Sequence, residues 1–427
     1  MPATLFLASY PPRECGIATF TRDVVGSVER TSGMRGGIIA VDQPGSERRY
    51  GGDVIGTLRD RDPDSYRQMA RLVNDHPARL LNIQHEYGLF GGEDGELLLD
   101  ALAQVRKPVA VTLHTVLPKP SEHHQYVTRE LCNRSDAVIV LSQTGKRILQ
   151  EIYALDERKI AVIHHGVPDV PFASTDAFKA ELGYGGRLVL STFGLISRGK
   201  GLEYAIEALP AIVERHPEVL YLIIGETHPV VRRQEGETYR EMLSAKIAAL
   251  GLQKNVAFIN QYLKLEQLIA YLRATDVYLT PYLNPVQIVS GTLAYAMGLG
   301  KAIVSTPYLY AEELLANRRG SLANFRDAAS IAAQINRLLD DPALRRCVER
   351  RADRFGRQMT WSNVARDYGR IFADLTSGEV RPALGRPLVP SGAQGLPAQL
   401  RQTGPLAPAQ RLAPVPVIDR DRRVRMS

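Results

Sequence analysis

The sequence lacks most of the features that place a protein outside the cell, in a membrane or around a structural metal. Its three cysteines, Cys15, Cys132 and Cys347, are far apart and form no Cys-x-x-Cys pair, so neither disulfides nor a cysteine zinc site is expected. No run of about 18 apolar residues occurs, which argues against a transmembrane helix. Residues 1–8 read directly into a strand without the basic segment of a secretion signal. We therefore expect a protein of the reducing cytoplasm.

The folded part of the chain also lacks a basic face for nucleic acid. The formal charge is +7, but residues 376–427 hold eight arginines against three acids and so carry +5 of it. Because nucleic-acid binding needs a basic surface, no nucleic-acid partner is expected. The same tail is rich in proline and has little periodicity, so we expect disorder. Two interpretations of this tail stay open: its terminal arginines contact an anionic membrane peripherally, at the inner face of the plasma membrane, or the tail is solvated and has no function.

Apolar runs that alternate with helical patterns predict an α/β chain with two Rossmann-like domains. The first expected set of buried strands is 3–9, 37–42, 80–84, 109–113, 138–142 and 160–164. The second set is 187–193, 219–224, 256–260, 277–280 and 302–305. Residues 361–372 repeat apolar side chains at helical spacing. We expect a first domain over 1–172, a second over 173–358, a terminal helix over 359–375 and a tail over 376–427.

The clearest ligand-binding pattern lies in residues 280–307. A strand ends at Thr280, and the turn Ser290, Gly291 and Thr292 opens a helix of small residues. A helix N-terminus offers free backbone N–H groups and the positive end of a dipole, which together bind phosphate. The competing interpretation is an ordinary βαβ unit, which any α/β domain contains.

A second phosphate-binding pattern follows the strand 187–193. Gly194 allows close approach of a ligand, and two cations, Arg198 and Lys200, stand just before the expected helix 202–212. These are the components of a diphosphate site. The alternative is two solvated cations on a loop.

Polar residues and glycines also follow other strands, where side chains face the ligand crevice of an open α/β sheet. His85 and Glu86 follow the strand 80–84, and His114 follows the next strand. Gly225 follows 219–224, and Gly16 lies in the turn after the first strand, where a glycine permits close approach. A lone histidine is more often structural, so these positions are candidates for the cleft.

Two segments carry a family resemblance. Leu293–Val304, Leu-Ala-Tyr-Ala-Met-Gly-Leu-Gly-Lys-Ala-Ile-Val, resembles the donor-site helix of retaining, family-4-type glycosyltransferases with the GT-B fold, and most closely the mannosyltransferases among them. Gly194–Gly201 is similar to the family's "GRLxxxKG" segment. Lys200 matches its lysine, Leu195 stands where its arginine is expected, and Arg198 follows three residues later. The resemblance implies two Rossmann-like domains facing a cleft, with a terminal helix that crosses back onto the first domain.

The resemblance also implies roles for individual residues. Gly16 matches a glycine beside the donor phosphates and the acceptor, and His114 matches a histidine near the donor sugar. The loop that stacks the base in the family matches Asn260, Gln261 and Tyr262.

The chain departs from the family at two donor-site positions. Gln287 stands where a glutamate lies near the donor sugar, and Tyr295 stands where a glutamate binds the ribose. Neither carboxylate is present, so an amide, a phenol or the backbone must meet the sugar hydroxyls.

The acids Asp60, Asp62 and Asp64 superficially form the DxD metal motif of the other large glycosyltransferase fold. Asp62 precedes a proline, and the expected helix 65–74 follows, so helix capping explains these acids without a metal. We expect no metal and no cofactor besides the nucleotide-sugar substrate.

The reaction implied by the resemblance moves a hexosyl group, as mannose from GDP-mannose, to a glycan or lipid-linked saccharide in polysaccharide synthesis, with retention of configuration. Arg198, Lys200 and the helix N-terminus would stabilise the leaving diphosphate. A second hypothesis, which Gln287 and Tyr295 support, is a non-catalytic GT-B protein that binds a nucleotide sugar or glycan. A third hypothesis, a nucleotide-sugar epimerase, would also need acidic residues in the cleft.

Overall fold

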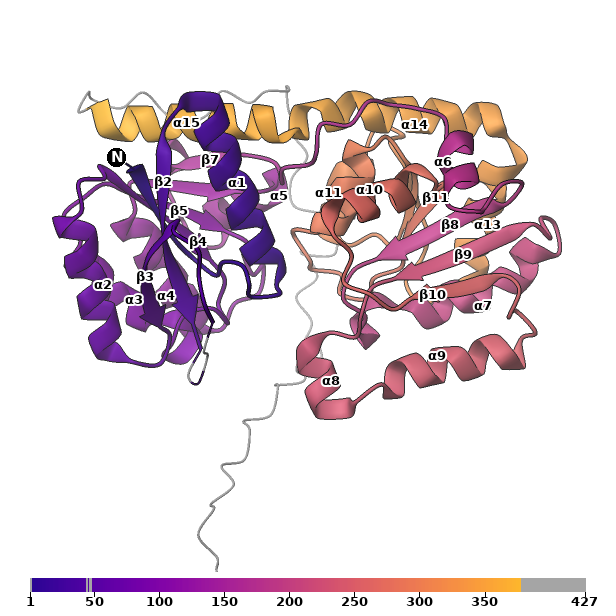
Figure 1. Cartoon of the computed structure of the whole chain (residues 1–427), viewed down its shortest axis with the longest axis horizontal. Coiled ribbons are helices and arrows are strands. Elements are labelled where there is room, and N and C mark those ends of the chain that lie inside the picture. Colours follow the sequence, from indigo (N-terminus) through magenta and orange to yellow (C-terminus); the bar gives the residue numbers. More distant parts are fainter. Residues whose placement is uncertain (1, 44, 46–47, 378–427) are drawn as a thin grey trace, which may run out of the picture. The chain divides into compact units, whose positions relative to one another are not determined.

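The computed structural model describes residues 2–43, 45 and 48–377 of the 427-residue chain. The described strands form two separate sheets, and every pairing within them is parallel (Figure 1). Parallel strands need long crossover connections, which are usually helical. The expected α/β architecture with two Rossmann-like units is therefore confirmed.

The first sheet, with its helices, is called the first lobe. Its seven strands run in the order β3-β2-β1-β4-β5-β6-β7. Their bounds are β1 Pro2–Ala8, β2 Arg35–Asp42, β3 Val54–Arg59, β4 Leu80–His85, β5 Val109–Leu113, β6 Ala137–Val140 and β7 Ile160–Val162. The helices are α1 Gly16–Ser32, α2 Pro63–Asp75, α3 Leu97–Leu102, α4 Glu122–Arg134 and α5 Gln143–Glu151, with short 3-10 turns η1 Glu93–Gly95 and η2 Glu157–Lys159.

The second sheet, with its helices, is called the second lobe. Its six strands run in the order β10-β9-β8-β11-β12-β13. Their bounds are β8 Leu188–Phe193, β9 Val219–Ile224, β10 Val256–Ile259, β11 Val277–Thr280, β12 Ala302–Ser305 and β13 Ser321–Leu322. The helices are α6 Asp176–Glu181, α7 Leu202–Val213, α8 Pro229–Glu235, α9 Thr238–Ala249, α10 Leu265–Arg273, α11 Gly291–Gly298, α12 Leu309–Leu315, α13 Ala328–Asp340 and α14 Pro342–Gly356, with η3 Arg198–Lys200 and η4 Arg357–Met359.

The last described helix, α15 Trp361–Ser377, packs on the first lobe beside α1 (Figure 1). Its buried stripe includes Phe372, whose ring lies 5.9 Å from the ring of Phe6 on β1. This is the crossing helix that the sequence predicts. The helix continues to Ser377, past the expected start of the tail at residue 376, and the Thr376 hydroxyl donates to the carbonyl of Phe372 at 2.8 Å. The rest of the expected tail, 378–427, lies outside the described residues, and the domain boundaries stay a prediction.

Two of the three acids at the start of α2 are engaged by helix capping or by ion pairs. Asp62 caps the helix, since its carboxylate accepts a hydrogen bond from the backbone N–H of Asp64 at 3.0 Å, and Pro63 occupies the first turn. Asp62 also pairs with Arg59 at 2.8 Å, and Asp64 pairs with Arg67. Capping and pairing thus explain both carboxylates.

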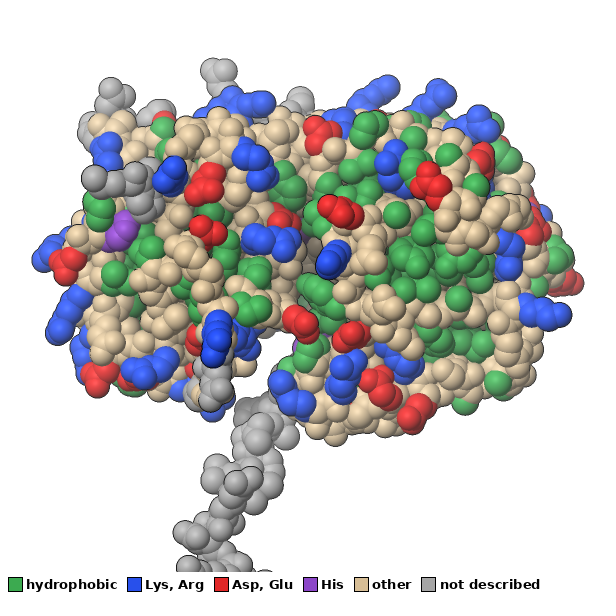
Figure 2. All heavy atoms as spheres, viewed as in Figure 1, with side chains coloured by type: hydrophobic (Ala, Val, Ile, Leu, Met, Phe, Trp, Pro, Cys, Tyr) green, Lys and Arg blue, Asp and Glu red, His purple; other side chains and the backbone are tan. Residues whose placement is uncertain are grey.

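No described helix is both long and apolar enough to cross a membrane. On the face drawn in Figure 2, basic and acidic side chains are interspersed over both lobes. Interspersed charges largely cancel at a distance, so recognition on this face depends on individual groups.

Candidate functional site

The N-terminus of α11 lies at the carboxyl edge of the second sheet. Ser290 is the N-cap, only 5% exposed, and its hydroxyl accepts a hydrogen bond from the backbone N–H of Leu293 at 3.3 Å. The same hydroxyl lies 3.1 Å from Oγ1 of Thr292. A cap of this kind satisfies one of the first backbone N–H groups and leaves the others directed out of the helix end. The expected turn Ser290, Gly291 and Thr292 is thus shaped to meet an anion.

Lys200 and Gly194 lie against this helix end. A Cβ placed on Gly194 would stand 3.2 Å from Cγ2 of Thr292 and 3.8 Å from Nζ of Lys200. Gly194 has a φ of +126°, a conformation that L side chains rarely adopt. The Lys200 ammonium also stands 3.8 Å from the ring centre of Tyr282, whose hydroxyl is 2.6 Å from Oγ1 of Thr292. A cation, a bare backbone and a helix N-terminus therefore converge at one point.

Gly225 supports this arrangement from the neighbouring strand end. Its φ is +135°, and a Cβ there would meet the carbonyl oxygen of Gly194 at 2.2 Å. The backbone N–H of Gly194 donates to the carbonyl of Ile224 at 2.9 Å. Gly225 is thus required for backbone packing that holds Gly194 in place, whether or not it also touches a ligand.

Arg198 has a different partner from the one that the sequence suggests. Its Nε lies 3.2 Å from Oε2 of Glu235 on α8, and its guanidinium stands 5.5 Å from the ring centre of Tyr239. The side chain is 56% exposed. Its expected role as a second phosphate cation stays a prediction, because that role would require the pair with Glu235 to loosen.

Both positions where the family has a glutamate carry neutral groups that are already engaged in packing. The Gln287 amide donates to the carbonyl of Val289 at 2.8 Å. Tyr295, on α11, is 8% exposed, with ring centres of Phe193 at 6.2 Å and His165 at 6.1 Å. Burial raises the pKa of Tyr295 well above its ordinary value, so the phenol stays protonated and can donate a hydrogen bond.

His114 lies at the carboxyl edge of the first sheet. Its Nε2 is 2.9 Å from Oε1 of Gln84, and its ring meets the ring of Phe20 edge-on at 4.9 Å. Burial lowers the pKa of His114 to about 3, with smaller contributions from His165 and His85. Because an amide oxygen can only accept, the neutral ring carries its proton on Nε2, which leaves Nδ1 as an acceptor.

His85 is the last residue of the neighbouring strand β4, and Glu86 directly follows it, but the two residues differ in exposure. The His85 ring is 1% exposed and stacks on Phe90 at 5.7 Å, and burial lowers its pKa to about 4. Glu86 is partly exposed, and its Oε2 accepts a hydrogen bond from the Thr115 hydroxyl at 2.7 Å. Burial raises the pKa of Glu86. His85 therefore lies within the core of the first lobe, whereas Glu86 lies nearer the surface.

Gly16 is the first residue of α1, directly after the N-cap Cys15. It is exposed, and nothing lies within 4 Å of the position that a Cβ would take. The expected role of Gly16, beside the donor phosphates and the acceptor, requires such open space next to its backbone. Three residues on, the Thr19 hydroxyl lies 3.4 Å from the hydroxyl of Tyr262, one of the expected base-stacking residues.

His165 is a site residue that the sequence analysis did not select. Its Nε2 stands 3.0 Å from the position of a Cβ on Gly291, and its ring centre is 5.1 Å from that of Phe20. Its Nδ1 lies 2.9 Å from the carbonyl oxygen of Gly166, and burial lowers its pKa to about 4. The sequence could have indicated His165, because this residue directly follows the expected strand 160–164, just as His114 follows the expected strand 109–113.

Two family models match the chain. The model described as "Glycosyltransferase Family 4" matches residues 39–169, and the model described as "Glycosyl transferases group 1" matches residues 174–355. The second match holds Gly194, Lys200 and the whole of α11.

Two relatives are similar over part of the sequence. The lipopolysaccharide core biosynthesis mannosyltransferase LpcC of Rhizobium leguminosarum bv. viciae is 26% identical over 225 residues, which are 52% of this chain and 59% of that protein. The phosphatidyl-myo-inositol mannosyltransferase of Mycolicibacterium smegmatis is 26% identical over 288 residues, 66% of this chain and 69% of that protein. The match thus spans less than two thirds of the first relative.

A solved structure is similar over nearly all of the described chain. The Anabaena protein Alr3699/HepE, crystallised in complex with UDP, superimposes with a TM-score of 0.69 at 18% identity, covering 87% of this chain and 100% of that one. An identity of 18% supports a shared fold and nothing more specific.

Proposed function

The chain belongs to the group 1 glycosyltransferases with the GT-B fold, and from that premise we propose that it moves a hexosyl group from a nucleotide sugar to a hydroxyl group. The observation that carries this proposal is the convergence of Lys200, Gly194 and the α11 N-terminus. The acceptor is proposed to be a glycan or a lipid-linked saccharide, with retention of the anomeric configuration.

The diphosphate of the donor would bind at the α11 N-terminus. Its negative charge grows as the bond to the sugar breaks, and fixed donors aimed at that charge lower the barrier. Lys200 supplies a full charge there, while Gly291 and Thr292 supply backbone N–H groups at the positive end of the helix dipole. In this mechanism the leaving phosphate itself accepts the proton of the acceptor hydroxyl.

The sugar would lie between the diphosphate and His114. With its proton on Nε2, His114 presents Nδ1 as an acceptor for a sugar hydroxyl. Its lowered pKa keeps the ring neutral, so it would not repel the positive charge that develops on the sugar. Tyr295 would donate a phenolic hydrogen bond where the family has a carboxylate.

We propose GDP-mannose as the donor and polysaccharide synthesis as the process. The support is that both relatives named above are called mannosyltransferases. Because the Anabaena structure of the same fold holds UDP, uridine donors belong in the test as well. Transfer rates measured with GDP-mannose, GDP-glucose, UDP-glucose and UDP-galactose distinguish a preference for the base from a preference for the sugar.

Release of nucleoside diphosphate, measured with one of these donors and an acceptor extract, tests the transferase. Lys200→Ala should lose most of the activity, whereas Lys254→Ala, which removes an exposed lysine of the same lobe, should retain it. No release with any donor would contradict the transferase.

A non-catalytic GT-B binding protein is the second candidate, and the neutral side chains at Gln287 and Tyr295 favour it. It predicts saturable donor binding that Lys200→Ala weakens, without release of nucleoside diphosphate in the presence of any acceptor. Calorimetry beside the release assay distinguishes the two candidates.

A further inference from the structure

A cluster of acids and histidines lies at the carboxyl edge of the first sheet, outside the site described above. The acids Glu93, Asp94 and Glu96 belong to η1 and the residue after it, in the loop that leaves β4. The histidines His123 and His124 belong to the first turn of α4, which follows β5. Because β4 and β5 pair in parallel, their following loops meet at one edge. Residues about thirty positions apart in sequence therefore lie together.

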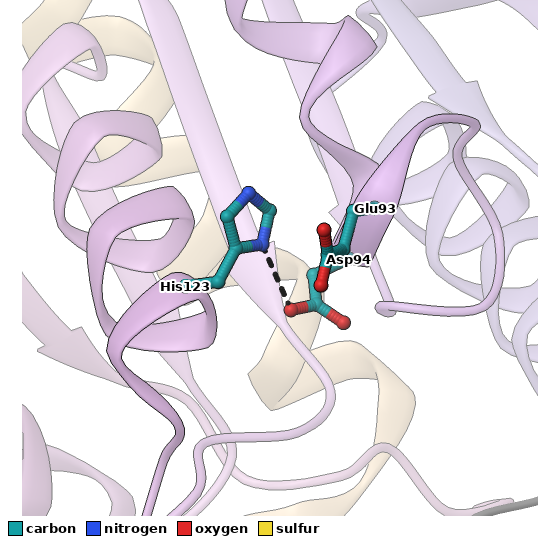
Figure 3. A group of neighbouring side chains, drawn as sticks. All are labelled: Glu93, Asp94 and His123. Atoms are coloured by element: carbon teal, nitrogen blue, oxygen red, sulfur yellow. Dashed lines mark hydrogen bonds and ion pairs between the residues drawn. The ribbon is translucent and has the colours of Figure 1, made fainter.

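His123 is held between two carboxylates. Its Nδ1 lies 3.0 Å from Oδ2 of Asp94, and its Nε2 lies 3.2 Å from Oε2 of Glu96 (Figure 3 shows the Asp94 contact). The carboxylate of Glu93 points to the same place, and one ligand atom from each of Glu93, Asp94 and His123 lies within 4.8 Å of the others.

The remaining residues hold these three groups in position. Nε2 of His124 lies 3.0 Å from Oδ1 of Asp94, and its Nδ1 lies 2.7 Å from the hydroxyl of Ser121. Ser121 is the N-cap of α4 and accepts from the backbone N–H of His124 at 3.1 Å, so its own proton can go to Nδ1. His124 then donates from Nε2 to Asp94, which leaves Oδ2 of Asp94 directed at His123.

We propose that Glu93, Asp94 and His123 form a binding site for a divalent transition-metal ion such as Zn²⁺. Without an ion, both ring nitrogens of His123 donate to carboxylates, so binding would displace the Nδ1 proton that faces Asp94 and release it to solvent. Glu96 would still accept the Nε2 proton, as the outer carboxylate partner of a metal-bound histidine usually does. Two carboxylates and a neutral imidazole balance the charge of the ion. An imidazole nitrogen beside two carboxylates is a ligand set that suits Zn²⁺ better than Mg²⁺ or Ca²⁺.

The distances fit an ion with small side-chain adjustments. Bonds of about 2.0–2.2 Å to a tetrahedral ion place ligand atoms roughly 3.3 Å apart. The separation of 3.0 Å between His123 and Asp94 is already close to that value, and Glu93 is exposed and free to approach. Three protein ligands leave one position for water.

No lysine or arginine within the described ranges forms an ion pair with Glu93, Asp94 or Glu96; Asp94 pairs with both histidines and Glu96 with His123. Three acids collected without a permanent cation favour a positive ion among them. A bound ion would fasten the loop that carries Glu86 to the start of α4. The site is structural and lies apart from Lys200 and α11, so it does not depend on the proposed transferase activity.

Zinc binding to the untagged full chain tests the proposal. After treatment with a chelator and its removal by dialysis, the wild type should bind about one equivalent of Zn²⁺ in calorimetry near neutral pH. His123→Ala should lower the affinity by more than roughly 100-fold, and Glu96→Gln, which keeps all three ligands, by roughly 10- to 100-fold. Mg²⁺ at the same concentration should not compete.

His216→Ala is the matched control. His216 also pairs with a carboxylate, Asp340 at 3.0 Å, but in the second lobe and beside Arg215. This variant should bind Zn²⁺ as the wild type does. Melting curves provide a second readout, because Zn²⁺ should raise the melting temperature of the wild type and of His216→Ala but not of Asp94→Asn. Equal affinities of the wild type and His123→Ala, or effective competition by Mg²⁺, would overturn the proposal.

Discussion

Oε1 of Gln84 lies 2.9 Å from Nε2 of His114 and so fixes which nitrogen of the ring carries the proton. The Gln84 amide nitrogen in turn lies 3.4 Å from Oγ1 of Thr112, which is 3.0 Å from the hydroxyl of Tyr368 on α15. A chain of polar groups therefore joins α15 to the candidate sugar-binding histidine.

Gln84→Glu should change the pH dependence of the transfer. A carboxylate beside His114 favours the imidazolium, so the pKa of His114 should rise from about 3 towards neutrality. If neutral His114 is needed, the rate of the variant should fall as the pH drops between about 8 and 5, where the wild type shows no such limb. Gln104→Glu, at an exposed position of the same lobe, is the control. Identical profiles for all three proteins would remove His114 from the mechanism.

Lys200→Ala should weaken donor use more than any other cation removal in the second lobe. Loss of a charge-assisted phosphate contact of about 1.5–3 kcal/mol corresponds to a decrease of roughly 10- to 150-fold in kcat/KM for the donor. Arg198→Ala should have a smaller effect, since Arg198 would first have to leave Glu235. Steady-state kinetics with varied donor measures both. Wild-type kinetics for Lys200→Ala would contradict the diphosphate site.

His85→Phe should make the protein less sensitive to acid. The folded pKa of His85, about 4, is below the ordinary value near 6.5, so the unfolded chain takes up a proton first as the pH falls. The contribution of neutral His85 to the free energy of unfolding is therefore fully present at neutral pH, and it decreases as the pH falls from about 6.5 to 4. Between pH 7 and 5 the variant should lose about 2 kcal/mol less free energy of unfolding than the wild type.

Urea titrations at both pH values test the His85 prediction. His114 and His165 also have lowered pKa values, but they are present in both proteins, so their contributions cancel in the difference. A phenylalanine can keep the stacking contact with Phe90. Equal acid sensitivity of the two proteins would show that His85 does not carry this linkage.

Transfer should continue in the presence of EDTA. Asp62 and Asp64 are engaged in capping and pairing at the start of α2, and the proposed charge stabilisation uses Lys200 and a helix end instead of a metal. If the cluster around His123 binds zinc, EDTA should lower the melting temperature while the initial rate stays unchanged. Initial rates with and without EDTA and added Mg²⁺ decide this, and a strict metal requirement would contradict the mechanism.

Much of the fold could be predicted because parallel strands are buried on both faces and read as continuous apolar runs. Strands β4 and β5 illustrate this, since every residue in them is buried. Strand β3 was missed because it is an edge strand in which exposed and partly buried residues alternate, among them Gly56 and Thr57.

The candidate site was predictable where one segment builds it and less so where several segments meet. Ser290, Gly291 and Thr292 are adjacent, so the sequence itself indicates a helix N-terminus. The contact of His114 with Gln84, and that of His123 with Asp94, depends on strand order and on side-chain direction. A local sequence pattern contains neither the strand order nor the direction of a side chain. For the same reason the pairing of Arg198 with Glu235 could not be anticipated.

Removal of everything after Ser377 should leave the fold intact and weaken only membrane binding. The last buried residue of α15 is Leu375, so the truncated chain keeps the whole contact of that helix with the first lobe. Four of the removed arginines, Arg420, Arg422, Arg423 and Arg425, are close together, and each adds about 1 kcal/mol near an anionic surface. The truncated protein should therefore melt at the same temperature and use a soluble acceptor equally well. It should bind anionic liposomes less tightly at low salt, where screening is weak. A lower melting temperature would refute the first half of this prediction, and unchanged liposome binding would refute the second.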